Sequence, residues 1–132
     1  MADRKNSVLV VDDEPLIRLA LVMAFEEQGF QVVEAGNVLE AIAVIARGHV
    51  DALVTDIDMP GGLSGLDLAE LVAAISSAAI VVVSGRPLPP DCILPTGAVF
   101  FAKPYNIEHV IAAARAQIAE RGNASRATAG LT

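Results

Sequence analysis

Three aspartates at the ends of two apolar segments are the residues of this chain best suited to chemistry. Asp12 and Asp13 follow the run Val8-Leu9-Val10-Val11, and Asp56 follows Ala52-Leu53-Val54-Thr55. In open α/β sheets, side chains at the carboxyl ends of parallel strands point into the crevice where ligands bind. Three carboxylates about 5 Å apart repel one another by about 3 kcal/mol per pair at an effective dielectric of about 20. The cluster therefore predicts a neighbouring cation, either a hard metal ion or an ammonium group.

Two further polar residues are predicted to lie at the same edge of the sheet. Ser84 ends the apolar run 79–83, and Lys103 follows the run 98–102. Together with the aspartates, they suit phosphoryl transfer to a carboxylate, because a divalent cation held by carboxylates neutralises charge on the phosphoryl oxygens. The sequence therefore predicts a metal-dependent phosphoryl-transfer site.

Each of the five residues has a predicted role. Asp13 and Asp56 are expected to hold Mg²⁺ (or Mn²⁺) directly, and Asp12 through water, because Mg²⁺ keeps several of its waters in protein sites. Asp56 is the predicted nucleophile, which would form an acyl phosphate. Ser84 is expected to donate a hydrogen bond to one phosphoryl oxygen, and Lys103 a charge-assisted bond to another.

The elements that must position these residues alternate between short apolar runs and segments with helical spacing, which is typical of a parallel α/β sheet. Pro15 predicts a helix start, because its missing N–H matters little in the first turn, and Gly29 predicts the end of that helix. Asn37 and Asn106 are predicted helix caps. Strands are predicted at 7–11, 30–34, 52–55, 79–83 and 98–102, with helices beginning near 15, 38, 64 and 107.

The segment between the last two predicted strands breaks this alternation. Residues 87–95 contain four prolines, which remove backbone donors and fix φ. We therefore expect an irregular loop in place of a regular helix, with at most one turn around 91–94.

Composition limits the class of protein. The chain has 132 residues, which suits one domain with a single core, and its formal net charge is −7. There is no apolar run near the roughly 18 residues of a membrane span, no secretory signal pattern, and the single Cys92 excludes an internal disulfide. Nucleic-acid binding needs a basic cluster, which the sequence lacks. We expect a cytoplasmic protein with protein partners, and neither a nucleic-acid nor a membrane partner.

Four motifs in this order resemble the receiver domain of two-component response regulators: Asp12-Asp13, Asp56 with Met59-Pro60, Ser84-Gly85 and Lys103-Pro104. The resemblance runs from Ser7 to about Arg121. It implies a flavodoxin-like (βα)5 α/β fold in three layers, with a five-stranded parallel sheet in the order 2-1-3-4-5. In this chain the fourth helix is expected to be short or replaced by the proline-rich loop. The receiver domain is expected at 1–121, followed by a flexible C-terminal tail at 122–132.

The resemblance also implies a function in bacterial phosphorelay signal transduction. Asp56 would accept phosphate from a phosphohistidine on a sensor histidine kinase or a histidine phosphotransferase, and the backbone carbonyl of Asp58 would complete the metal site. Phosphorylation would draw Ser84 toward the phosphate and reorient Phe100, which changes the surface seen by an unknown downstream protein. A stand-alone receiver of this kind acts by phosphorylation-dependent binding or as a phosphate sink or shuttle, without the turnover of a conventional enzyme.

The chain departs from the family pattern at three places. Phe100 stands where such receivers often carry a tyrosine, so the usual phenol hydrogen bond is absent. The proline-rich loop replaces a helix that normally forms part of the output face, as in a minority of receivers whose partners are often variant histidine kinases. The turn at 61–65 is rich in glycine and one residue longer than the commonest form.

Three other interpretations remain open from the sequence. The run Asp56-Ile57-Asp58 matches the aspartate-x-aspartate motif of haloacid-dehalogenase-type phosphatases, although their metal-binding acidic pair follows the lysine, whereas Asp12-Asp13 precedes it. The chain also fits an interaction module that never uses phosphate, or the receiver fragment of a longer regulator. Taken singly, Phe100 fits plain core packing, and the side chain of Asp58 fits a solvated loop acid.

Overall fold

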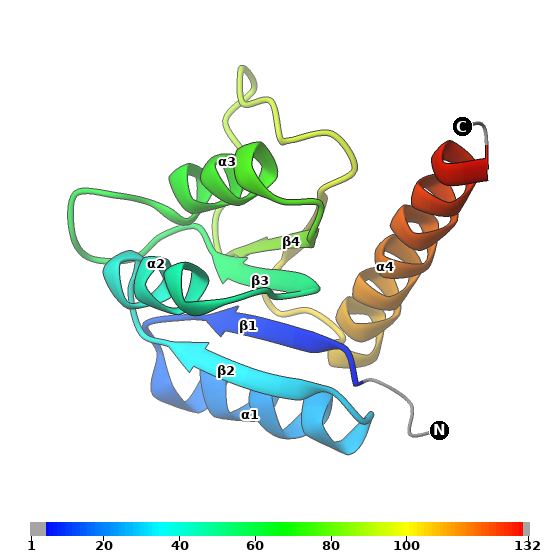
Figure 1. The fold of residues 1–132 in the computed structure, drawn as a ribbon. Coiled ribbons are helices and arrows are strands. Elements are labelled where there is room, and N and C mark those ends of the chain that lie inside the picture. Colours follow the sequence, from blue (N-terminus) through cyan, green and yellow to red (C-terminus); the bar gives the residue numbers. More distant parts are fainter. Residues whose placement is uncertain (1–4, 131–132) are drawn as a thin grey trace.

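The computed structural model describes the backbone of residues 5–130 and the side chains of residues 5–122. Five parallel strands form one sheet in the order β2-β1-β3-β4-β5 (Figure 1). The strands are β1 (Ser7–Val11), β2 (Gln31–Ala35), β3 (Ala52–Asp56), β4 (Ala79–Ser84) and β5 (Val99–Ala102). This arrangement confirms the predicted flavodoxin-like fold and its strand order.

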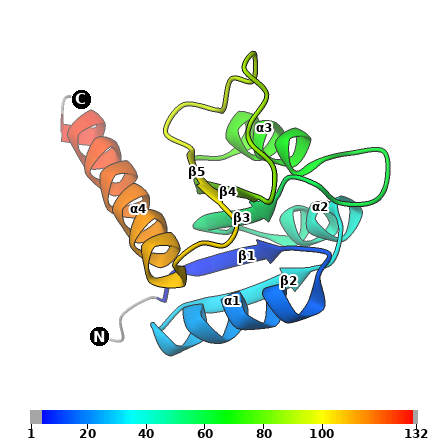
Figure 2. The ribbon, with the colours of Figure 1, turned by 180° about the vertical axis from the view of Figure 1, so that it is seen from behind.

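Four helices complete the described part of the chain: α1 (Pro15–Glu27), α2 (Val38–Arg47), α3 (Gly65–Ile75) and α4 (Ile107–Gly130). Figures 1 and 2 show α1 and α4 on one face of the sheet and α2 and α3 on the other, in agreement with the two core clusters. Because both faces are covered, β1, β3 and β4 are buried along almost their whole length. Within the described residues, no helix has the length and hydrophobicity that crossing a membrane requires.

Local signals explain where the helices begin. Pro15 occupies the first turn of α1. The side-chain oxygens of Asn37 and Asn106 accept backbone hydrogen bonds at the starts of α2 and α4, as predicted. Ser64 and Asp67 form a reciprocal capping box at the start of α3. These caps pair backbone donors that a helix start otherwise leaves without partners.

No helix connects β4 to β5 in the described chain, which confirms the predicted proline-rich loop. The loop contains two turns, in which Cys92 N donates to Pro89 O at 2.9 Å and Ala98 N donates to Pro95 O at 3.0 Å. The first turn lies beside the single turn expected around 91–94, and the second turn was not predicted. Prolines favour turns because they fix φ, and Gly97 supplies the left-handed position of the second turn with φ at +85°.

The last helix runs further than predicted. α4 continues to Gly130, whereas the sequence placed the start of a flexible tail at 122. Residues 122–130 contain three alanines and no proline, so no residue among them must end a helix. The backbone of the segment predicted as a tail is therefore helical as far as Gly130. Residues 131–132 lie outside the described range, and the flexibility assigned to 122–132 stays a prediction.

Candidate functional site

The predicted acidic residues meet at the carboxyl edge of the sheet. Asp12 follows the last residue of β1 and Asp56 is the last residue of β3, so two neighbouring strands bring these carboxylates together. Asp12 is 0% exposed and Asp56 is 3% exposed. One carboxylate oxygen from each of Asp12, Asp13, Glu14 and Asp56 lies within 4.8 Å of the others. Glu14 was not predicted from the sequence, although its place directly after the aspartate pair is a signal for it.

The ammonium group of Lys103 lies within this acidic cluster. Lys103 follows β5, and its Nζ lies 3.3 Å from Asp12 Oδ2, 3.2 Å from Glu14 Oε1 and 3.4 Å from Asp56 Oδ2. Buried carboxylates are unfavourable without a compensating charge, and Lys103 supplies part of that charge. This placement agrees with the ammonium neighbour expected from the sequence. Its binding of a phosphoryl oxygen stays a prediction.

Burial shifts the ionisation of the groups in the cluster. Burial, and next the charge of Asp12, raise the pKa of Asp56 from 3.8 to about 6, although Lys103 opposes the change. Burial also raises the pKa of Asp12, against the hydrogen bond from Glu14 N and the charge of Lys103. Burial by itself would lower the pKa of Lys103, but the charges of Asp12 and Asp56 together outweigh it and raise that pKa. The site therefore holds more negative charge than its surroundings stabilise.

One oxygen of Asp12 makes no hydrogen bond within the part of the chain that the structure describes. Asp12 Oδ1 accepts from Glu14 N at 2.9 Å. Asp12 Oδ2 is fully enclosed, and the Lys103 ammonium 3.3 Å away attracts it without hydrogen-bond geometry. A buried polar atom without a partner is unfavourable, and Mg²⁺ prefers carboxylate oxygen ligands. The donor set therefore fits a divalent cation held by the acidic cluster.

Asp12 is also held through its backbone. Arg18 of α1 donates from Nη1 to the Asp12 carbonyl at 2.6 Å and from Nε to Glu34 of β2 at 2.9 Å. Asp12 N donates to Ala35 O at 3.2 Å. Arg18 was not predicted as a site residue, because helical spacing does not indicate which carbonyl an arginine reaches.

Ser84 ends β4 at the same edge, but its hydroxyl is engaged outside the acidic cluster. Ser84 Oγ donates to Asp58 Oδ2 at 3.3 Å and accepts from Arg86 N at 3.0 Å. Arg86 Nε lies 3.8 Å from the same Asp58 oxygen, and the Arg86 side chain is 82% exposed. The side chain of Asp58 is thus a partner of Ser84 that was not predicted. The roles of Ser84 toward phosphate and of the Asp58 carbonyl toward the metal stay predictions.

Phe100 on β5 and Tyr105 on the loop that follows it are two aromatic residues near the site. Phe100 is paired with Val82 in the sheet, which places Phe100 on the face covered by α2 and α3, and its side chain is half-buried. Its function as a switch stays a prediction. Burial, and next the charge of Asp12, raise the pKa of Tyr105 to about 12. A neutral phenol, which was not predicted from the sequence, therefore lies close to the acidic cluster.

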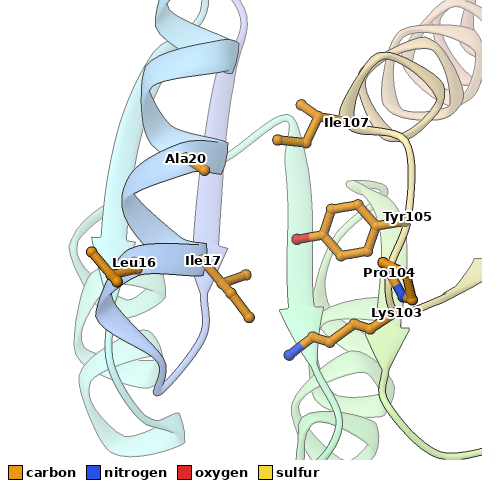
Figure 3. Close-up of a pocket in the computed structure, with 7 residues that line it drawn as sticks. All are labelled: Leu16, Ile17, Ala20, Lys103, Pro104, Tyr105 and Ile107. Carbon is orange, nitrogen blue, oxygen red and sulfur yellow. The ribbon is translucent and has the colours of Figure 1, made fainter.

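A groove beside the site separates α1 from the segment that carries Lys103. Its volume is about 490 Å³, and its lining consists of Leu16, Ile17, Ala20, Lys103, Pro104, Tyr105 and Ile107. Figure 3 shows Ile17, Tyr105 and Ile107 pointing into the space between α1 and this segment. The groove therefore places apolar surface next to the acidic cluster.

Comparison with known proteins identifies the family of this site and fold. A family model described as the response regulator receiver domain matches residues 8–115. The chain belongs to this family. This receiver is 34% identical over 119 residues to a protein of Pseudomonas aeruginosa named as a transcriptional regulator, with 86% of this chain and 57% of that protein covered. It is 30% identical over 122 residues to the virulence regulator BvgA of Bordetella pertussis, with 86% and 56% covered. The receiver therefore spans just over half the length of these curated relatives.

Solved structures agree with the family. The response regulator TrrA of Thermotoga maritima, solved in complex with Mg²⁺–BeF, is 29% identical with a TM-score of 0.74, and the match covers 85% of this receiver and 98% of that chain. A response regulator receiver protein of Sinorhizobium medicae is 24% identical with a TM-score of 0.79, and the match covers 89% and 98%. The resemblance to two-component receivers that the sequence motifs indicated is confirmed.

Proposed function

We propose that this receiver accepts a phosphoryl group on Asp56 from a phosphohistidine of a sensor histidine kinase or a histidine phosphotransferase. The supporting observation is that four carboxylates and one ammonium group converge at the carboxyl edge of the sheet. Family membership favours this signalling role over that of a haloacid-dehalogenase-type phosphatase. The expected result is one acyl phosphate per chain, without the turnover of a conventional enzyme.

In the proposed transfer, a carboxylate oxygen of Asp56 attacks the phosphorus atom while the P–N bond to the histidine breaks. The electron pair of that bond returns to the histidine nitrogen, and Asp56 becomes an acyl phosphate. Asp56 must be ionised to attack, and its pKa of about 6 leaves most of it ionised at neutral pH. Lys103 Nζ lies 3.4 Å from Asp56 Oδ2 and would hold a phosphoryl oxygen by a charge-assisted bond.

The acidic cluster also suits the metal that the reaction is expected to need. Asp12, Asp13 and Asp56 would hold Mg²⁺, with the backbone carbonyl of Asp58 as a further ligand. Bound there, the ion would supply positive charge that offsets the carboxylates and the phosphoryl oxygens. The enclosed Asp12 Oδ2, which has no hydrogen-bond donor in the described part of the chain, supports this assignment.

Ser84 is proposed to report the presence of the phosphoryl group. Its hydroxyl has a single hydrogen, which is donated to Asp58 Oδ2. To donate to a phosphoryl oxygen, Ser84 must release Asp58, and this exchange would move the end of β4. Phe100, on the neighbouring strand, would then reorient and change the surface that downstream partners contact.

The groove between α1 and the segment 103–107 is proposed to receive the protein that carries the phosphohistidine. A donor must bring its phosphate to Asp56, so it must cover the adjacent surface, where Leu16 and Leu19 are 81% and 49% exposed. Leu16→Ser should slow phosphorylation by the kinase and leave phosphorylation by acetyl phosphate unchanged, because the small donor does not need the groove. An equal loss with both donors would contradict docking at this surface.

An amide NMR titration with Mg²⁺ and then beryllofluoride, which mimics a phosphoryl group, tests the proposed function. Saturable shifts are expected around Asp13, Asp56, Ser84 and Lys103, and they should be absent from Asp56→Ala. A wild-type protein that shows no shift with either addition would contradict the proposal and favour an interaction module that does not use phosphate.

The predicted stand-alone organisation has a separate test. The curated relatives are longer than this chain and are named as transcriptional regulators. An immunoblot of native cell extract should show a single band at the mass of this chain if the receiver acts alone. A larger band would make it part of a longer regulator, for which a nucleic-acid partner would be expected.

A further inference from the structure

The first residue of α3 lies directly against the backbone of the proposed phosphoacceptor. A Cβ atom at Gly65 would lie 1.8 Å from Asp56 O and 2.9 Å from Thr55 Oγ1. Packed side chains do not approach other atoms so closely, so only the hydrogen atom of glycine fits there. Gly65 does not adopt the left-handed backbone conformation. The position therefore requires glycine for space and not for a special φ.

The same backbone is held from other sides. Thr55 Oγ1 donates to Asp56 O at 2.9 Å, and Thr55 is 0% exposed. One residue further, Ile57 N donates to Val83 O at 2.9 Å, and Ile57 O accepts from Gly65 N at 2.9 Å. The two peptide groups that follow the Asp56 side chain are therefore fixed, the first to β4 and the second to α3.

α3 is itself anchored and has little room to retreat. Leu68, Ala69 and Val72 are buried in the core between the sheet and the α2–α3 layer. The capping box of Ser64 and Asp67 fixes the first turn of the helix. Because strand and helix are both held, an added methyl group would displace the short segment that joins them, which begins at the Asp56 carbonyl.

We propose that Gly65 and Thr55 are positioning residues, which fix the Asp56 peptide so that its carboxylate points into the acidic cluster. The inference rests on the proposed function, because it concerns the alignment of Asp56 with its metal and phosphoryl group. Neither residue touches the reacting atoms, and both act through the carbonyl of Asp56. A misplacement of about 1 Å is enough to impair such an alignment strongly.

A matched pair of glycine substitutions, one at the start of α3 and one in the loop before it, tests this inference. Gly65→Ala is compared with Gly62→Ala, since a Cβ at Gly62 would meet no atom of the described residues within 4 Å and Gly62 is not left-handed. With Mg²⁺ and beryllofluoride as probes, Gly65→Ala should weaken beryllofluoride binding at least about tenfold. Gly62→Ala should leave the affinity unchanged. Without Mg²⁺, the amide signals of residues 56–58 should move in Gly65→Ala and not in Gly62→Ala.

Thr55→Val is the second variant. It tests the positioning inference by itself if Gly65→Ala does not fold. Valine keeps the buried shape of threonine but removes the donor to Asp56 O. Binding of beryllofluoride should weaken about threefold or more, as expected for the loss of one hydrogen bond that aligns the acceptor. The urea midpoint, measured in parallel, separates this effect from a general loss of stability.

The outcomes separate the inference from the proposed function. If wild-type protein binds beryllofluoride and the folded variants bind it equally well, the positioning role is overturned and the proposed function stands. A lower urea midpoint with unchanged affinity would likewise reduce both residues to a structural role. A weakened affinity in one folded variant alone would overturn the role of the other residue. If wild-type protein does not bind beryllofluoride, the proposed function fails and this inference fails with it.

Discussion

Asp51 and Asp56 lie at opposite ends of β3, and their carboxylates are in opposite situations. Asp51 accepts hydrogen bonds from Ser7 N at 2.8 Å and from Ser7 Oγ at 3.3 Å, and His49 Nε2 lies 2.8 Å from its other oxygen. Asp56 lies instead in a cluster of acidic groups with Asp12, whose Oδ2 has no hydrogen-bond donor among the described residues. Asp51, just before β3, is therefore held by hydrogen bonds, whereas Asp56, at the carboxyl end of β3, is buried among other carboxylates with Lys103 as its cation.

The difference shows which acidic residues are available for chemistry. At the amino end, the hydrogen bonds of Asp51 connect β3 to β1, so its carboxylate has a structural role. At the carboxyl end, burial and the charge of Asp12 raise the pKa of Asp56 to about 6. A cation bound at the carboxyl end would relieve this unfavourable ionisation, whereas the Asp51 carboxylate at the amino end already accepts hydrogen bonds. Perturbed ionisation of this kind is a known mark of functional sites.

Removal of the ammonium group at the carboxyl end should have the largest effect. Lys103→Met keeps an apolar stem but leaves Asp12, Glu14 and Asp56 without their ammonium neighbour. The rate of phosphorylation by acetyl phosphate should fall about 100-fold, as for the loss of one preorganised donor in other active sites. His49→Ala, at the amino end, is the control and should leave the rate unchanged. Equal phosphorylation rates for Lys103→Met and wild type would contradict the claim that the carboxyl end of β3, and not the amino end, is the functional one.

Asp56→Asn should change the free energy of unfolding in a way that depends on pH. Folding raises the pKa of Asp56 from 3.8 to about 6, so the folded protein binds this proton more tightly, and stability falls as pH rises across that interval. The difference corresponds to about 3 kcal/mol at most. Without Mg²⁺, Asp56→Asn should therefore be more stable than wild type at pH 7 by up to this amount, and the advantage should vanish at pH 3.

Urea denaturation of both proteins at the two pH values measures this difference. Added Mg²⁺ should reduce it at pH 7, because the ion stabilises only the protein that binds it. A lower stability of Asp56→Asn than of wild type at pH 7 without Mg²⁺ would show that Asp56 is satisfied in the fold, as Asp51 is.

A change at the amino end of β3 should have the opposite sign. Asp51→Ala removes the acceptor of Ser7 N and should destabilise the protein by about 2 kcal/mol at pH 7, since a partly buried donor loses its charged partner. Its Mg²⁺ affinity, measured by NMR titration, should stay that of wild type. A gain in stability would mean that both ends of β3 carry unsatisfied charge.

The smallest effect is expected at Arg86. Its side chain is 82% exposed and lies 3.8 Å from Asp58, and exposed ion pairs contribute little. Arg86→Ala should therefore change the free energy of unfolding by less than about 0.5 kcal/mol. The backbone N–H of residue 86, which donates to Ser84 Oγ, survives the substitution. A loss well above this amount in urea denaturation would show that the exposed pair helps to hold Ser84.

The sheet and four of the site positions were predictable from the sequence for one physical reason. Asp12, Asp56, Ser84 and Lys103 each come at the end of an apolar run, and parallel strands bring such residues to one edge. The proline-rich loop was equally predictable, because proline removes the donors that a helix needs.

Other features depend on how the elements pack, which spacing along the chain does not encode. The contact of Gly65 with the Asp56 carbonyl requires α3 to pack tightly against β3. The glycine-rich sequence of 61–65 indicates a flexible turn and does not indicate this contact. Ser84 was expected to face the phosphate, but its hydroxyl bonds to Asp58, two residues past the end of another strand. The start of the tail was predicted at Gly122, but a glycine there does not have to end a helix, and α4 continues to Gly130.

Intact-protein mass spectrometry tests most directly whether Asp56 accepts the phosphoryl group. Wild-type protein and Asp56→Asn are incubated with acetyl phosphate and Mg²⁺, and the acyl phosphate is trapped by borohydride reduction and located by peptide sequencing. The expected result is a gain of one phosphoryl group in the wild type, located at Asp56, dependent on Mg²⁺ and absent from Asp56→Asn. A wild-type protein that gains no phosphoryl group, or gains one at another residue, would contradict the proposed function.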